Sequence, residues 1–179
     1  MGLDIVRAQM IEALPLGVTT YDLSVFVHIT AVMVGFGATF AEAIMFPVAL
    51  QAGVRHLPYV HKLQLAINQR LATPALVLVL GTGIYQVTQR WEFDQFWISA
   101  ALLIVIVIGG LNGAYFIPAD RRLGPMVEGE IAAAGDREIG LSDLSDEYQR
   151  GARLEGIVGA ISGLLLVVVV YLMVVKPGA

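Results

Sequence analysis

Two ionisable residues interrupt an apolar stretch of the chain, and they are the first candidates for chemistry. His28 and Glu42 both lie in "VFVHITAVMVGFGATFAEAIMFPVAL", residues 25–50. Fourteen residues of helix are about four turns and about 21 Å, so the two side chains share a helix face but not a site. Ionisable groups inside a membrane are costly and mark ligand, ion or proton pathways. The stretch therefore holds two separate candidate sites.

Glu42 lies about eight residues from the end of this stretch, and its position allows two interpretations. A charged side chain at this depth costs about 2.5 to 3.5 kcal/mol on insertion scales, so Glu42 should face the interior of a helix bundle. Arg70 and Asn112 are expected at a comparable depth. In one interpretation Glu42 pairs with either residue and fixes the packing, and in the other these residues handle protons or cations.

His28 lies near the opposite end of the stretch, among residues that are polar or aromatic. It is either a hydrogen-bonded histidine at the membrane interface or a ligand for a metal or for haem b. A neutral imidazole is the commonest metal ligand, and haem accepts methionine as a second axial ligand. Met173 is the only methionine expected at this depth, so His28 and Met173 are the candidate cofactor ligands.

The other residue types that perform chemistry give weak signals. His56 and His61 lie in "RHLPYVHK", and we interpret them as solvated loop residues. They are expected across the membrane from His28, on the order of 25 Å away or more, which excludes a haem held by two histidines of one chain. The chain has no cysteine, and it contains no arrangement typical of a hydrolase or of a zinc enzyme. This pattern favours a protein that is not an enzyme.

The composition shows which elements must position these residues. The chain has 179 residues, of which 57% are hydrophobic and 15% charged, against about 25% charged in soluble domains. A net charge of −4 without a basic patch argues against nucleic acid as a partner. A helix needs about 20 apolar residues to cross the hydrocarbon core of a bilayer. Four spans are predicted, at about residues 25–50, 67–88, 96–117 and 154–175.

We therefore predict an all-α polytopic membrane protein, a single domain over residues 1–179 with four transmembrane helices in an antiparallel bundle. Both termini then lie on one side, together with three of the eleven basic residues. Basic loops stay in the cytoplasm, which places both termini outside the cell. The cytoplasmic side carries eight basic residues: Arg55, Lys62, Arg70, Arg121, Arg122, Arg137, Arg150 and Arg153.

The segments outside the spans receive three further predictions. The cytoplasmic loop 118–152 is too small and too charged to bury a core of its own, and Ser145 caps a helix that continues into the fourth span. Residues 5–14, "IVRAQMIEAL", lie along the membrane surface as an amphipathic helix rather than forming a secretory signal. No internal repeat is evident, which disfavours an inverted-repeat transporter.

Small residues form strips on the third and fourth predicted spans. Such strips let helices approach closely in lipid, and they are compatible with a homodimer or a larger membrane complex. The alternative is that they line a pore or a substrate path. The residues are Gly109, Gly110 and Gly113 in the third span and Gly156, Gly159 and Gly163 in the fourth.

Four stretches carry a family resemblance, and together they cover most of residues 23–178. They are "VFVHITAVMVGFGATF", "INQRLATPALVLVLGTGIY", "YFIPADRRL" and "YLMVVKPG". In their order and spacing the chain resembles a family of predicted bacterial integral membrane proteins, a domain of unknown function. This resemblance implies a multi-pass protein of the bacterial plasma (inner) membrane.

That family is in turn similar to two groups of four-helix membrane proteins. These are the CopD-like copper-resistance proteins and the HemJ-type proteins, which bind haem and oxidise protoporphyrinogen. In both comparisons the histidine of the first helix corresponds to His28. The HemJ-type pattern also has a lysine in the third helix, where Asn112 is the nearest polar residue of this chain. The resemblance thus implies the fold and a role for His28, and it assigns no activity.

Three functional hypotheses follow. The first is a non-enzymatic structural or accessory membrane component whose polar residues fix packing and partner contacts. The second is a membrane protein that binds haem or a metal through His28. The third is a small proton-coupled carrier or channel that depends on Glu42.

Overall fold

The computed structural model describes residues 17–178, and within these residues it contains helices and no strand. The amphipathic helix expected over residues 5–14 lies outside the described residues. Four short helical turns accompany six α-helices: η1 (Val54–His56), η2 (Asn68–Ala72), η3 (Asn112–Phe116) and η4 (Leu141–Asp143). The α-helices are α2 (Thr20–Ala52), α3 (Leu57–Ile67), α4 (Thr73–Arg90), α5 (Phe96–Leu111), α6 (Ile117–Ala134) and α7 (Asp146–Val175).

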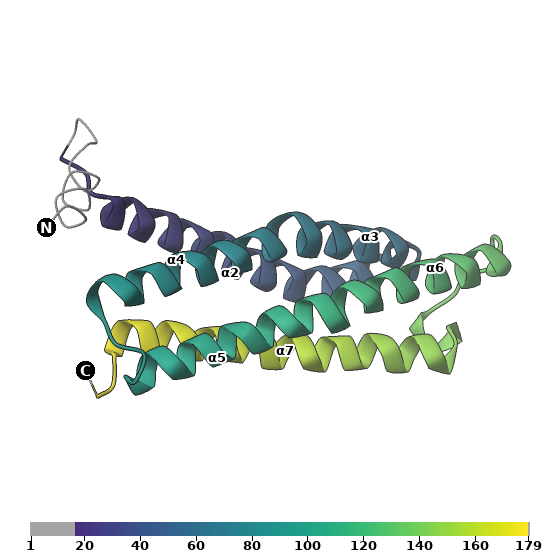
Figure 1. Ribbon diagram of the computed structural model, residues 1–179. Helices are drawn as coiled ribbons and strands as arrows, with labels where there is room; N and C mark the ends of the chain where they lie inside the picture. The colour runs from purple at the N-terminus through teal and green to yellow at the C-terminus, as the bar shows by residue number, and fades with distance from the viewer. Residues whose placement is uncertain (1–16, 179) are drawn as a thin grey trace, which may run out of the picture.

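These helices form four antiparallel rods, because α3 continues into α4 and α5 continues into α6 (Figure 1). All four rods are long and apolar enough to cross a membrane. The start of α2, the α4–α5 turn and the end of α7 lie together at one end, which we call the terminal end. The α2–α3 and α6–α7 connections lie at the other, which we call the loop end. The predicted all-α fold with four transmembrane helices is confirmed.

The first and fourth rods begin where a side chain accepts hydrogen bonds from the first N–H groups of the helix. Thr19 and Asp22 form a capping box at the start of α2, in which each side chain accepts from the backbone N–H of the other, at 3.1 and 3.0 Å. Ser145 caps α7, as predicted, because its hydroxyl accepts from the N–H of Tyr148 at 3.2 Å.

The second and third rods each contain one π-helical turn, and a proline causes both. Pro74 and Pro118 each follow an asparagine by six residues, at Asn68 and Asn112. Proline lacks an N–H group, and its ring clashes with the carbonyl four residues earlier in a regular α-helix. A wider turn relieves this clash. In each case the residue before the proline donates its N–H to the asparagine carbonyl five residues back.

The two π-turns are joined to each other by side chains. Asn112 Nδ2 donates to the hydroxyl of Thr73 at 3.2 Å, and that hydroxyl donates to the carbonyl of Asn68 at 2.8 Å. Both asparagines are buried. The repeated Asn-x5-Pro pattern is a local repeat that the sequence analysis did not identify.

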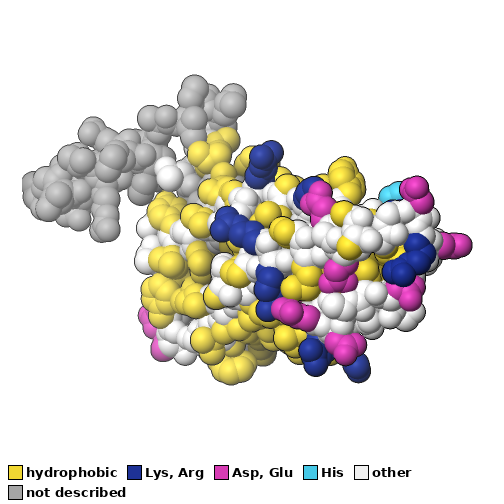
Figure 2. Space-filling model, turned by 90° about the vertical axis from the view of Figure 1, so that its right-hand side faces the viewer, with side chains coloured by type: hydrophobic (Ala, Val, Ile, Leu, Met, Phe, Trp, Pro, Cys, Tyr) yellow, Lys and Arg dark blue, Asp and Glu magenta, His cyan; other side chains and the backbone are white. Residues whose placement is uncertain are grey.

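At the loop end, α6 continues to Ala134 and packs with the start of α7 against α3 and the end of α2. Residues 118–152 therefore share a core with α2 and α3 and do not form one of their own. Apolar residues at helical spacing face inward, and charged residues of both signs cover the outside (Figure 2). The buried residues of this loop-end core are Ala49, Val54, Leu57, Val60, Leu123, Val127, Leu144 and Tyr148.

A second apolar core lies at the terminal end. It is covered by an aromatic pair, Trp91 and Trp97, whose rings meet edge to face at 5.2 Å. Lys176 Nζ lies 4.4 Å from the Trp91 ring, and the Arg90 guanidinium lies 4.0 Å from the Tyr21 ring. Aromatic residues of this kind mark the headgroup level of a membrane. The buried residues of the terminal-end core are Trp97, Ile98, Ala101, Val105, Val169 and Leu172.

The rods are longer than a bilayer is thick. They contain 30 to 39 residues, or about 45 to 58 Å, against a hydrocarbon core of about 30 Å. Glu42 lies 22 residues from the start of α2, which is about 33 Å along the helix. With the terminal end at one headgroup level, Glu42 lies near the opposite boundary of the hydrocarbon and the loop-end core lies beyond it.

The predicted glycine strips do not mark close contacts between helices of this chain. A Cβ atom added at any of the six glycines would meet no heavy atom within 4 Å. The close approaches occur instead at the loop end, where a Cβ at Gly124 would lie 3.2 Å from the Cβ of His61. A Cβ at Gly151 would lie 2.6 Å from Leu123 Cδ2. Gly156 and Gly159 line a cavity between the rods. Packing of these strips against a second copy of the chain stays a prediction.

Candidate functional site

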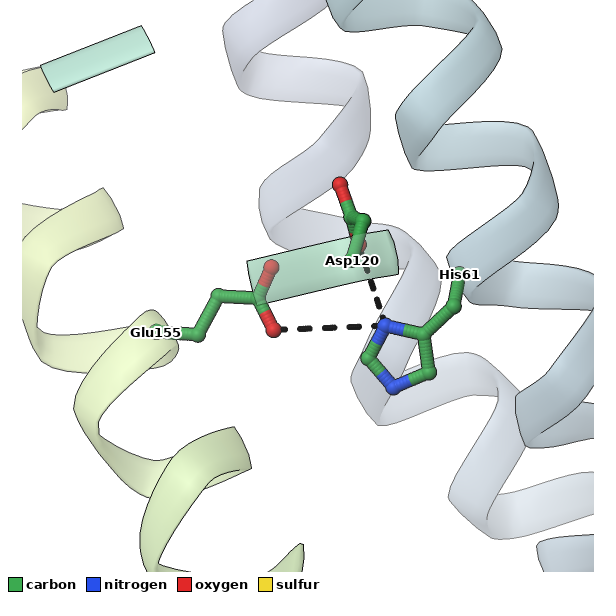
Figure 3. A group of neighbouring side chains, drawn as sticks. All are labelled: His61, Asp120 and Glu155. Carbon is green, nitrogen blue, oxygen red and sulfur yellow. Dashed lines mark hydrogen bonds and ion pairs between the residues drawn. The ribbon is translucent and has the colours of Figure 1, made fainter. Parts of the chain in front are cut away.

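Three helices bring ionisable side chains together where the loop-end core meets the membrane portion. His61 comes from α3, Asp120 from α6 and Glu155 from α7, and they face one another (Figure 3). His61 Nδ1 lies 3.0 Å from Asp120 Oδ1 and 4.0 Å from Glu155 Oε2. The three residues are 1%, 2% and 8% exposed. We call them the polar cluster.

The local sequence explains why these side chains face inward. His61 follows Leu57 by one helical turn, so it continues the buried face of α3. Asp120 lies two residues after Pro118, where the chain leaves the π-turn, and it precedes the buried Leu123 by three residues. Gly124 provides the space in which α6 approaches His61. The polar cluster therefore belongs to the same packed faces as the loop-end core.

Tyr148 holds the second ring nitrogen of His61. Its hydroxyl lies 3.0 Å from His61 Nε2, and the side chain is fully buried. A neutral imidazole carries one N–H, which Asp120 accepts at Nδ1, and the phenol then donates to Nε2. A protonated imidazole would donate at both nitrogens. His61 therefore keeps both hydrogen bonds in either charge state.

The polar cluster is rich in carboxyl groups and poor in compensating charge. Glu42 lies close enough to Asp120 and Glu155 for their charges to interact. Glu42 Oε1 and Asp120 Oδ2 are buried and accept no hydrogen bond. Among residues 17–178, no lysine or arginine forms an ion pair with any of these three carboxyl groups. Buried polar atoms normally have partners, so this arrangement has capacity for a bound cation or a polar group.

A cavity of about 370 Å³ opens between the four rods on the membrane side of the polar cluster. Its walls are mostly apolar, and include Gly35, Leu76, Val105 and Leu166. Polar side chains gather toward the loop end of this central cavity. Those with a buried atom that has no hydrogen-bond partner are Glu42, Gln64, Asn112 and Ser162.

A separate pocket of about 80 Å³ lies at the terminal end, and it brings His28 and Met173 together. Thr82 donates its hydroxyl to the carbonyl of Leu78 and therefore accepts from His28 Nδ1, at 2.8 Å. This assignment leaves Nε2 of His28 with a free lone pair. The role of His28 and Met173 as cofactor ligands stays a prediction.

A haem b does not fit this terminal-end pocket. Pockets for small organic ligands measure about 300 to 1,000 Å³, and this one is several times smaller. The two tryptophans of the aromatic pair and Gly83, whose added Cβ would lie 3.4 Å from His28 Cε1, occupy the space beside the imidazole. A porphyrin would require the helices to separate here.

The expected partners of Glu42 are not its partners in the structure. Arg70 is exposed on the outside of the bundle, whereas Glu42 lines the central cavity. Asn112 also lines the cavity, but its amide donates to Thr73. The structure therefore shows no pairing of Glu42 with either residue, and Glu42 Oε1 has no hydrogen-bond partner. The handling of protons or cations by these residues stays a prediction.

His61 was predicted to lie in a solvated loop, and its buried hydrogen-bond partners were not predicted. The structure buries His61, because residues 57–67 form a helix of the bundle rather than a loop. A signal for Glu155 was present in α7, where buried residues recur every seven positions at Tyr148, Glu155, Ser162 and Val169. Seven residues are about two helical turns, so these side chains share one face. The polar residues on this face, such as Glu155, point toward the polar cluster and the central cavity.

The fold and the polar cluster define the class of this protein: an α-helical membrane protein of four spans, with ionisable residues in its interior. The chain belongs to the family of predicted integral membrane proteins DUF2269, whose model matches residues 22–177. No curated protein and no solved structure matches the chain.

Proposed function

We propose that the protein is a small carrier or channel that binds a cationic solute in the central cavity. The observation that carries the proposal is a largely apolar cavity whose polar end holds the carboxyl group of Glu42, with Oε1 buried and without a hydrogen-bond partner. A solute with an apolar body and one positive charge matches both parts of this surface.

The size of the cavity supports a small organic solute. Its volume of about 370 Å³ lies within the range of about 300 to 1,000 Å³ that is usual for small-molecule sites. The remaining polar atoms, from Gln64, Asn112 and Ser162, offer hydrogen bonds beside the charge. They favour a solute with a polar head, such as an amine, over a plain hydrocarbon.

The depth of Glu42 supports a role in moving charge across the bilayer. At about 33 Å from the start of α2, its carboxyl group lies near the boundary of the hydrocarbon on the loop-end side. A carboxylic acid that releases its proton when a cation binds keeps the total charge of the site constant. This exchange corresponds to the proton-coupled carrier among the functional hypotheses.

The test is exchange of ethidium for protons in liposomes that contain the purified protein and a pH-sensitive dye. We expect ethidium added outside to drive protons out of the lumen. In the Glu42→Gln variant the charge-assisted contact, worth about 1.5 to 3 kcal/mol, is lost, so the rate should fall by about tenfold or more. Glu128→Gln is the matched control, because Glu128 is an exposed carboxylate that pairs with Lys62.

Equal rates for the wild type and Glu42→Gln would contradict a role for this carboxyl group. Equal rates for protein-containing and empty liposomes would contradict carriage of an aromatic cation. Both results would favour the structural or accessory hypothesis, in which the hydrogen bonds of the polar cluster hold three helices together.

A further inference from the structure

We propose that His61, Asp120 and Glu155 bind a divalent first-row transition metal ion. The proposal is independent of what the central cavity transports. It rests on the placement of three ligand atoms, on a buried oxygen without a partner, and on the chemistry of the ligand set.

The three ligand atoms converge from three different helices. One atom from each residue lies within 4.8 Å of the others, and His61 Nδ1 lies 3.0 Å from Asp120 Oδ1 and 4.0 Å from Glu155 Oε2. Imidazole nitrogen and carboxylate oxygen bind zinc at about 2.0 to 2.2 Å. Ligands at this radius stand about 3 to 3.5 Å apart around one ion. A rotation of the Glu155 side chain that moves its carboxyl group by about 1 Å would complete the set.

Asp120 provides the second observation that points to a ligand. The residue is 2% exposed, and its Oδ2 atom has no hydrogen-bond partner although Oδ1 accepts from His61. Buried carboxylate oxygens normally have a partner, so Asp120 has capacity for a further ligand contact. A metal ion bound by the cluster would neutralise the charges of Asp120 and Glu155. Glu42 would then be the one uncompensated carboxyl group near the cavity.

Tyr148 is placed as the outer partner of the metal-bound imidazole. Histidine ligands usually donate their second ring N–H to a neighbouring oxygen, which fixes the orientation of the ring. With a metal at Nδ1, His61 Nε2–H would donate to the Tyr148 hydroxyl, at the observed 3.0 Å. Phe46 packs against the same ring edge to face, with centroids 6.4 Å apart. The imidazole is therefore already held in one orientation.

The ligand types select the class of metal. One imidazole and two carboxylates suit zinc, cobalt, manganese or ferrous iron. The chain has no thiolate to favour cuprous ion, and the histidine is atypical of calcium or magnesium sites. Glu155 also lines the central cavity, so the proposed site borders that space.

The test measures Co²⁺ and Zn²⁺ binding by the detergent-purified, chelator-treated protein. We expect about one Co²⁺ per chain, displaced by Zn²⁺, with a visible spectrum that shows nitrogen coordination. Asp120→Asn and His61→Gln should weaken binding by about a hundredfold or more, and Tyr148→Phe by about tenfold, as for an outer partner. His56→Gln is the control, because that histidine is exposed in the same segment.

Near-ultraviolet circular dichroism of each variant shows whether it is folded. Where Asp120→Asn or His61→Gln is not folded, Glu155→Gln decides, since Glu155 forms no hydrogen bond to His61 in the structure. Absence of stoichiometric binding by the wild type would overturn the proposal. So would unchanged affinity in folded Asp120→Asn or Glu155→Gln. The readout requires no ethidium flux, so either proposal can fail while the other stands.

Discussion

At the scale of single residues, His61 shows how a polar side chain is accommodated in a buried place. Both ring nitrogens have a partner, and its neighbour Gly124 leaves space for the approach of α6. Removing one partner from a buried hydrogen bond leaves the other group desolvated and without a hydrogen bond, which costs the desolvation free energy of that group. The stability of the loop end should therefore respond to deletion of one oxygen atom.

Tyr148→Phe is the variant that tests this expectation. It keeps the ring in the loop-end core but leaves His61 Nε2 without a partner. We expect the metal-free protein to lose about 1 to 3 kcal/mol of unfolding free energy, measured by denaturation in detergent. Tyr171→Phe, at an exposed position near the terminal end, should change stability little. Equal losses in both variants would show that the His61 hydrogen bond contributes nothing.

The sequence predicted single residues unevenly. It singled out His28, Met173 and Glu42, which the structure places in two pockets. Asp120 and Glu155 were not predicted as site residues, because a carboxylate near the end of an apolar run is usually a charged residue at the membrane interface. Only the contact among three rods, separated in the sequence by 59 and 35 residues, distinguishes a buried carboxylate from a solvated one.

At the scale of helices, packing distances differ between two neighbouring turns in the first half of α7. A Cβ atom at Gly151 would meet the buried side chain of Leu123, whereas one at Gly156 would enter the open cavity. Overpacking of a core costs about 1 to 3 kcal/mol. An alanine in place of glycine inside a helix otherwise contributes up to about 1 kcal/mol of stability.

We therefore expect Gly151→Ala to lower the thermal midpoint in detergent and Gly156→Ala to leave it unchanged or raise it. The two variants carry the same chemical change on one helix, five residues apart, so each is the control for the other. The opposite order of midpoints would contradict the packing of α6 against α7 seen here.

The spans were the most predictable elements, because about 20 apolar residues in a run have few alternatives to a membrane helix. The helix from Ser145 into the fourth span was predicted, whereas the continuation of the second rod beyond the membrane as α3 was not. Charged residues on α6 conceal the apolar side that packs in the loop-end core. The repeated Asn-x5-Pro pattern shows that each proline lies inside one continuous rod, after a π-turn.

At the scale of the whole molecule, two apolar cores enclose a polar and hollow middle. The loop-end core lies beyond the polar cluster, and the terminal-end core closes the opposite end of the central cavity. The outer surface between them is apolar, with Phe26, Met33, Leu103 and Leu164 more than 60% exposed. This arrangement fixes the depth of the site and leaves open which side of the membrane the loop end faces.

The excess of basic residues at the loop end predicts that it lies in the cytoplasm. The chain has no cysteine, so single cysteines report their location without background. In intact bacterial host cells, a membrane-impermeant maleimide should label Asp94→Cys in the α4–α5 turn. It should label Asp136→Cys, beyond α6, only after permeabilisation. The reverse labelling pattern would establish the opposite orientation.

The cation–aromatic contacts at the terminal end have a consequence for the lipid that surrounds the protein. Arg90 over Tyr21 and Lys176 over Trp91 place cations beside aromatic rings at that end, where we expect one headgroup layer. Because the rods exceed the bilayer in length, any change in acyl-chain length is taken up at the loop end. Longer acyl chains draw Glu42 and Glu155 into hydrocarbon, and shorter ones leave them among headgroups and water. We therefore expect lipid composition to set the depth of the polar cluster relative to the headgroups.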